Sequence, residues 1–289
     1  MKKIAILGCE NSHANAFLNF IRDKEEFADV EVVGVYSDDT TAAEKLNQIY
    51  GVPVMQSYTD AVGKIDGLIV TARHGGSHYK FAKPYIESRI PMFIDKPVTI
   101  KEEEAVEFVR LLKENCIRVC GGSSLKHDEF IKKLKEDSLT EQGGKTVGGY
   151  VRAPYISENE YGGFYFYSQH LVEMVCEIFG GFPRSVTAKK NGKQIHVLFH
   201  YDDYDSVGVF CDQSSVYYAS RMSETDATSY MIPFTEDWFY GEFKEFYSIL
   251  SGNEQAVGYD RFVSPVFIMN AIMRSLDSGK EETVGRPEI

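Results

Sequence analysis

The chain has 289 residues, 43% of them apolar and 26% charged, which suits a globular protein of two modest domains. Its net charge of −12 disfavours nucleic acid and anionic membrane surfaces as partners. No run approaches the ~20 apolar residues of a membrane span, polar residues follow Leu7 too early for a signal peptide, and five cysteines without a C-x-x-C pair fit free thiols, so we expect a cytoplasmic protein.

The first part of the chain alternates short β-branched runs with helical patterns, which is typical of βαβ units. Strands are predicted at residues 3–7, 30–37, 65–72, 91–97 and 117–122, with a short strand and a helical turn within 51–62. Helices are predicted at residues 15–26, 41–50, 78–89 and 101–116, the third one bent or interrupted at Pro84. We therefore predict an N-terminal dinucleotide-binding Rossmann domain, a doubly wound parallel sheet, over residues 1–122.

The pattern changes from Ser123 onward. Helices are predicted at residues 128–139, 168–180, 236–252 and 262–279. Strands are predicted at residues 146–156, 184–191, 193–201, 205–212, 215–221 and 227–233. Short turns between consecutive strands favour an open antiparallel or mixed sheet. We predict a C-terminal α+β domain over residues 123–289 that binds substrate, with helices on one face of its sheet.

The loop after the first strand reads "GCENSHA". Of the G-x-G-x-x-G pattern only Gly8 is present, because Glu10 and His13 stand where the second and third glycines belong. A carboxylate at Glu10 would repel a diphosphate by a few kcal/mol at an effective dielectric of ~20. Asn11, Ser12 and His13 could donate hydrogen bonds to an anion at the helix start, although Asn11 or Ser12 could equally be a simple N-cap.

Three further segments carry a resemblance to a known family. They are "DGLIVTARHGGSHYKFAKPYIESRIPMFIDKP", "HLVEMVCEIFGGFPRSVTA" and "FVSPVFIMNAIMRSLDSGKEETV". Together they resemble the Gfo/Idh/MocA oxidoreductases, which include glucose-fructose oxidoreductase and inositol dehydrogenase. The resemblance implies an NAD-dependent dehydrogenase that transfers hydride between nicotinamide and the hydroxyl of a sugar, polyol or related compound.

The resemblance also implies site residues. Lys96, in "DKP" with Asp95 in place of a glutamate, and His170 match the family's catalytic lysine and histidine, while Phe166 stands where the family has an aspartate. A lysine beside a nicotinamide ring would have a lowered pKa, and a first-turn helix position would favour neutral His170, whereas Glu173 on the same face opposes this. The alternatives are a solvated Lys96 and a structural His170.

The remaining contacts follow in the same way. Cofactor contacts are expected from Gly8, Glu10, Asn11, Ser12, His13, Ser37, Asp38, Thr71, His74, His78, Asp95 and Lys96, with loop architecture as an alternative for His78. Substrate contacts are expected from Lys96, Tyr165, Tyr167 and His170, the two tyrosines as hydrogen-bond donors or aromatic walls. No arginine lies near the "YSDD" segment to hold a 2′-phosphate, so NAD is favoured over NADP.

Other functions remain open at this stage. His196 and His200 are ~13 Å apart along a strand, too far to share a metal, and no metal site is expected. The altered loop and absent aspartate leave a regulatory ligand-binding relative as an alternative. An NAD-assisted elimination or glycosidase reaction is another. Apolar positions on the uncovered face of the second sheet favour a homodimer or homotetramer.

Overall fold

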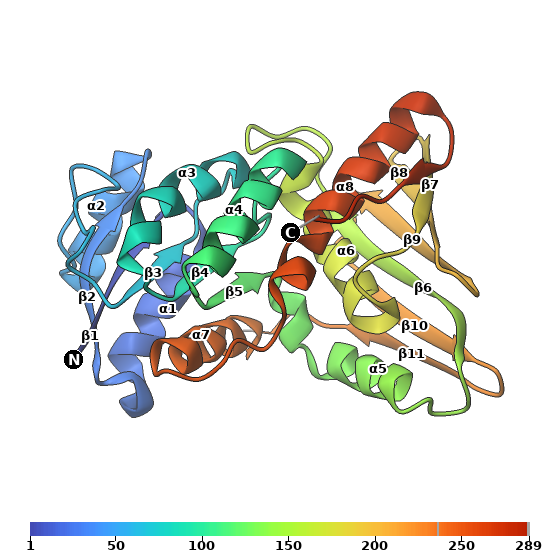
Figure 1. Cartoon of the computed structure of the whole chain (residues 1–289), viewed down its shortest axis with the longest axis horizontal. Helices are drawn as coiled ribbons and strands as arrows, with labels where there is room; N and C mark the ends of the chain where they lie inside the picture. The colour runs from blue at the N-terminus through green and yellow to red at the C-terminus, as the bar shows by residue number, and fades with distance from the viewer. Residues whose placement is uncertain (236, 288–289) are drawn as a thin grey trace.

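Two β-sheets, one from each half of the chain, carry the helices (Figure 1). The computed structural model describes residues 1–235 and 237–287. The elements of the first half are β1 (Lys2–Leu7), α1 (Ser12–Asp23), η1 (Glu25–Phe27), β2 (Val30–Tyr36), α2 (Thr40–Tyr50), β3 (Gly67–Val70), η2 (Gly75–Ser77), α3 (His78–Ala82), η3 (Lys83–Ser88), β4 (Met92–Asp95), α4 (Glu102–Glu114) and β5 (Val119–Gly122).

The first sheet is parallel, with the strand order β2-β1-β3-β4-β5. Its central strands β3 and β4 are buried at every position, as expected of strands covered on both faces. One face packs on α3 and α4, and the other on α1 and α2. The predicted doubly wound fold is confirmed, and the helix around Pro84 changes there from α3 to the tighter η3.

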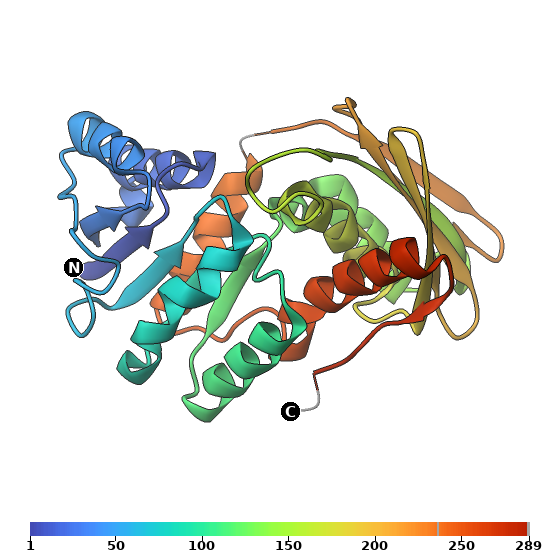
Figure 2. The same ribbon diagram turned by 90° about the horizontal axis from the view of Figure 1, so that it is seen from above.

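The second half of the chain forms a seven-stranded sheet with the order β11-β10-β6-β9-β8-β7-β12. Its elements are η4 (Ser124–His127), α5 (Glu129–Leu139), β6 (Thr146–Tyr155), α6 (Tyr165–Phe179), β7 (Ser185–Asn191), β8 (Gln194–His200), β9 (Asp205–Asp212), β10 (Tyr217–Ser223), β11 (Ala227–Ile232), α7 (Asp237–Leu250), α8 (Tyr259–Ser278) and β12 (Glu282–Thr283). The sheet is mixed, because β6 pairs in parallel with β9 while the other described pairs are antiparallel. Helices α5, α6 and α8 lie on one of its faces (Figure 2).

Helix α7 departs from this division of the chain. It follows the last long strand of the second sheet but packs against α1 and β5 of the first domain (Figure 2). Phe243 and Phe246 of α7 share one hydrophobic cluster with Phe17, Phe27 and strand residues of the first sheet, each of these four phenylalanines fully buried. The helix predicted from residue 236 begins at Asp237, and Glu236 itself lies outside the described residues.

The turn between β1 and α1 explains the one retained glycine of its loop. Gly8 has a φ of +98°, and a Cβ there would lie 2.1 Å from the backbone nitrogen of Ala72. Asn11 is the N-cap of α1, since its Oδ1 accepts a hydrogen bond from the Ser12 N–H. The helix therefore starts at Ser12, three residues before the predicted start.

Among the described residues, no helix is both long and apolar enough to cross a bilayer.

Replacing Gly8 by alanine should destabilise the protein strongly. The new methyl group collides with rigid backbone, and the left-handed conformation adds strain of ~1 kcal/mol or more. Gly51→Ala is the matched control, because Gly51 has a φ of +70° and no neighbour within 4 Å of the added Cβ. Thermal unfolding of both variants should show the larger drop in Tm for Gly8→Ala, and equal drops would contradict the close approach to Ala72.

Candidate active site

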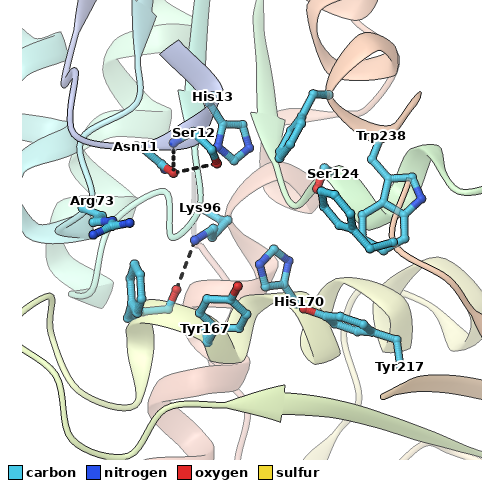
Figure 3. Close-up of a pocket in the computed structure, with 13 residues that line it drawn as sticks. Asn11, Ser12, His13, Arg73, Lys96, Ser124, Tyr167, His170, Tyr217 and Trp238 are labelled. Carbon is cyan, nitrogen blue, oxygen red and sulfur yellow. Dashed lines mark hydrogen bonds between the residues drawn. The ribbon is translucent and has the colours of Figure 1, made fainter. Parts of the chain in front are cut away.

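A cavity of about 270 Å³ lies between the two halves of the molecule (Figure 3). Its walls come from the start of α1, the loop after β3, the end of β4, helix α6, strand β10 and the start of α7. The described lining residues are Asn11, Ser12, His13, Arg73, Lys96, Ser124, Phe166, Tyr167, His170, Tyr217, Phe234, Trp238 and Phe239. The structure thus brings together the expected catalytic pair, Lys96 and His170, with part of the expected cofactor loop.

Lys96 stands directly after β4 and is only 5% exposed. Its Nζ donates a hydrogen bond to the carbonyl of Phe166 at 3.3 Å and lies 4.7 Å from the centre of the Phe166 ring. Burial lowers the pKa of Lys96, although the charges of Asp95 and Glu242 act against this shift. The solvated alternative for Lys96 is therefore wrong, because its amine is enclosed and faces the cavity.

His170 is buried at the opposite wall. A hydrogen bond of 2.7 Å joins its Nδ1 to the Ser123 hydroxyl, which leaves Nε2 as the second polar atom of the ring. Burial, then the charges of Lys96 and His13, hold the pKa of His170 well below its usual range. Because α6 begins at Tyr165, His170 lies in the second turn and not in the first as predicted, so the helix dipole contributes little.

Glu173 does not favour a charge on His170. Its Oε1 pairs with Arg261 at 2.6 Å, and its Oε2 accepts hydrogen bonds from Gln169 and the Ser123 backbone. The ion pair with Arg261 neutralises Glu173, and the His170 imidazole stays neutral.

A buried ionic cluster lies behind Lys96. His13 Nδ1 is 3.4 Å from Asp95 Oδ2, and His13 Nε2 is 3.1 Å from Glu242 Oε2 on α7. Burial opposes a charge on His13, but the two carboxylates outweigh it and raise its pKa. One nitrogen and two carboxylates within 4.8 Å are also donors that suit a divalent cation. Each ring nitrogen faces a different carboxylate, however, so a protonated imidazole accounts for the arrangement.

Glu10 is turned away from the cavity. Its carboxylate accepts hydrogen bonds from the Ser37 hydroxyl at 2.6 Å and from the Arg73 backbone N–H at 2.8 Å. This places Glu10 across the ends of β2 and β3. The Glu10 carboxylate is therefore not among the described groups that line this first cavity.

A second cavity, of about 330 Å³, lies at the ends of β2 and β3. Its described lining residues are Glu10, Asp38, Asp39, Ala72, His74, Ser77, Phe81, Glu160 and Tyr161. Four of these are carboxylates, so the cavity is strongly acidic. Asp38 also accepts a hydrogen bond from Tyr36, and Lys80 lies 4.0 Å from Asp38 without lining the cavity.

Several residues that we expected to contact the cofactor or the substrate instead form hydrogen bonds within the protein. The Thr71 hydroxyl donates to the Gly8 carbonyl, and His78 is fully buried between the carbonyls of Ala72 and Pro97. The loop-architecture alternative for His78 is thus the one the structure favours. Tyr165 donates a hydrogen bond to Asn270 on α8 and is not among the described residues that line the first cavity, whereas Tyr167 is.

The two histidines of β8 have separate polar partners. His200 contacts Asp205 at 2.8 Å and Thr187 at 2.9 Å, while His196 contacts Gln194. The His200 contacts reach β7 and β9, whereas the His196 contact stays within β8.

Other lining residues were not predicted. Helix α7 contributes Trp238 and Phe239 to the lining and Glu242 to the ionic cluster. No sequence pattern indicated that this helix packs against the first half of the chain. Arg73 follows β3 at the carboxyl edge of the sheet, and that position is the signal that could have identified it.

Comparison with known proteins adds to this geometry. Residues 2–122 match the Gfo/Idh/MocA family model, described as an oxidoreductase family with an NAD-binding Rossmann fold. A search of the curated proteins found no match.

Similar solved structures span nearly the whole chain. Myo-inositol 2-dehydrogenase from Lactobacillus plantarum is 14% identical, covering 98% of this chain and 99% of that one with a TM-score of 0.85. Scyllo-inositol dehydrogenase from Lactobacillus casei, solved with bound NAD(H) and scyllo-inositol, gives the same four values. GenD2 from gentamicin A biosynthesis, in complex with NAD, is 13% identical, covering 98% of this chain and 96% of that one with a TM-score of 0.85.

At such identities these likenesses establish the fold. The family match covers the parallel sheet and its loops, including Gly8, Arg73 and Lys96. Residues 2–122 therefore belong to the Gfo/Idh/MocA oxidoreductase family and form its NAD-binding Rossmann fold, as the sequence resemblance predicted.

Proposed function

We propose that this protein is an NAD-dependent dehydrogenase that oxidises a hydroxyl group of a sugar, polyol or related compound. The observation that carries the proposal is that Lys96 and His170 line one cavity, which we call the catalytic cavity. Both are buried bases whose surroundings disfavour their charged forms. The inositol dehydrogenases of the same fold support the substrate class.

The residues present fit a dinucleotide. The acidic cavity offers Asp38 and neighbouring carboxylates to ribose hydroxyls, while the catalytic cavity is walled by aromatic rings that suit a nicotinamide and the C–H face of a sugar. Asn11 and Ser12, at the start of α1, line the catalytic cavity, where a helix N-terminus favours an anion. When bound, NAD would accept the hydride from the substrate carbon.

The chain's own groups would then handle the proton. His170 Nε2 or the Lys96 amine would accept it from the substrate hydroxyl, and Ser123 would keep the His170 ring oriented. The aspartate expected at residue 166 is replaced by phenylalanine, whose ring packs on Lys96. Phe166 cannot ionise, so it adds no carboxylate that would raise the pKa of Lys96, and burial lowers that pKa.

The uncovered face of the second sheet supports self-association. Leu198 of β8, Met222 of β10 and Met231 of β11 are 40%, 47% and 69% exposed, and Tyr150 and Tyr218 lie side by side on neighbouring strands. Such an apolar sheet face is typical of an interface. We propose a homodimer or homotetramer formed through this face.

Light scattering should give a multiple of 32.7 kDa for the wild type. Replacing Leu198 by aspartate should shift the mass toward one chain, because a buried charge opposes association. Leu139→Asp is the control, since Leu139 is exposed at the end of α5, away from this face. A monomeric wild type would contradict the interface.

Lys96→Arg should lower kcat for alcohol oxidation by at least about 100-fold, because arginine keeps its proton. In the wild type, the rate should rise with pH as the bases lose their protons, with an apparent pKa below 10.5 since burial lowers that of Lys96. His170→Ala should lower kcat similarly while NADH binding, followed by fluorescence, stays unchanged.

His196→Ala is the control for the histidine variant, since His196 is exposed on the second sheet. Equal losses of NADH binding and turnover in His170→Ala would contradict its role as a base. Product analysis with sugars and polyols must show NADH formed in step with a carbonyl product, which separates oxidation from elimination or glycoside cleavage. A chain that binds no NADH at millimolar concentration would contradict the whole proposal.

NADH should bind at least about tenfold more tightly than NADPH, a difference of ~1.4 kcal/mol. The added 2′-phosphate would face the carboxylates of Asp38 and Asp39 in the acidic cavity. Asp38→Asn should reduce the preference for NADH over NADPH. Asp203→Asn, in the second half of the chain, should leave that preference unchanged. A wild type that prefers NADPH would contradict this assignment.

A further inference from the structure

The two cavities meet at Arg73. Its neighbours Ala72 and His74 line the acidic cavity, while Arg73 itself lines the catalytic cavity. Arg73 Nη1 donates to the hydroxyl of Tyr161, another residue of the acidic cavity, at 3.2 Å. If one cavity holds the adenosine ribose and the other the nicotinamide, the diphosphate that joins them must pass this junction.

The guanidinium of Arg73 contacts aromatic rings, and no carboxylate among the described residues pairs with it. It lies 4.9 Å from the centre of the Tyr161 ring and 6.0 Å from that of Phe166. Its buried Nε has no hydrogen-bond partner within the part of the chain that the structure describes. None of the ion pairs formed by the described residues includes Arg73. Cation–π contacts therefore hold the group in place and leave its charge without a carboxylate partner among the described residues.

The surrounding charge points to an anion. The described lining of the catalytic cavity includes Arg73 and Lys96 but no carboxylate. Asp95 is engaged behind the wall by Asn11 and the Lys96 backbone, and Glu10 is held over the strand ends by Ser37 and the Arg73 backbone. Phe166 removes the further acid that the family resemblance led us to expect. Arg73 and Lys96 are like charges, and Arg73 contributes to lowering the pKa of Lys96.

We propose that Arg73 binds the cofactor diphosphate and replaces the grip lost with the second and third glycines of the loop. Its side chain lies in the same cavity as Asn11 and Ser12 at the start of α1 (Figure 3). A guanidinium can bind two phosphate oxygens at once, which compensates for the backbone approach that Glu10 prevents. Arg73 is thus a cofactor-binding residue, and this inference rests on the proposed function.

The test measures binding and needs no turnover. Titrations of NADH and ADP-ribose, which share the diphosphate, are compared with titrations of adenosine, which lacks it. Arg73→Gln should weaken the binding of NADH and of ADP-ribose by the same factor, about 10- to 100-fold, and should leave the binding of adenosine unchanged. Arg73→Lys should recover part of the loss. Raising the salt concentration should weaken ADP-ribose binding less in Arg73→Gln than in the wild type.

Arg152→Gln is the matched control, because Arg152 is a partly buried arginine of the second sheet whose Nε also has no partner among the described residues. It should bind all three ligands as the wild type does, and thermal unfolding should show that each variant is folded. If Arg73→Gln binds ADP-ribose normally but raises the KM of an anionic substrate, Arg73 recognises the substrate and the inference is wrong. If the wild type binds neither NADH nor ADP-ribose, the proposed function fails as well.

Discussion

The position of Lys96 depends on the burial of charge at the end of β4. Asp95 is fully buried, accepts a hydrogen bond from the Lys96 backbone at 2.7 Å, and faces His13, which in turn faces Glu242. Buried ions persist only where each one is paired, because leaving one unpaired costs several kcal/mol. Helix α1, strand β4 and helix α7 must therefore be in place together for Lys96 to reach the cavity.

This constraint also explains the altered loop. A glycine at residue 13 would let helix and strand approach closely, whereas the imidazole of His13 fills that space and connects two carboxylates. Glu10 likewise replaces a glycine and joins the ends of β2 and β3 through Ser37 and the Arg73 backbone. The loop has exchanged backbone access to a diphosphate for side-chain contacts that order the site.

Charge is then divided along the crevice. One cavity is lined by four carboxylates, whereas the described lining of the other includes Arg73, Lys96 and His13 but no carboxylate, although the chain as a whole has a charge of −12. A local positive region inside a negative molecule attracts small anions in preference to large polyanions. The separation matches a dinucleotide, because its ribose hydroxyls donate hydrogen bonds to carboxylates whereas its diphosphate needs positive charge.

The sequence predicted what local periodicity and motif order determine. The alternation of strands and helices predicted the parallel sheet, and "DKP" with the later histidine helix drew attention to Lys96 and His170, which line one cavity. The start of α6 was missed because Tyr165, Phe166 and Tyr167 follow two glycines and look like loop. Arg73 and Glu242 were missed because each is a single charged residue whose role depends on partners distant in sequence. An amphipathic helix such as α7 shows which of its faces is apolar, but not which sheet it will cover.

The return of α7 has a consequence for folding during synthesis. The first sheet is complete in sequence at Gly122, yet Phe17 and Phe27 are covered by residues beyond 240. While the second sheet is being translated, the apolar surface around these phenylalanines has no partner within the finished part of the chain. The first domain therefore reaches its native core only after nearly the whole protein has left the ribosome.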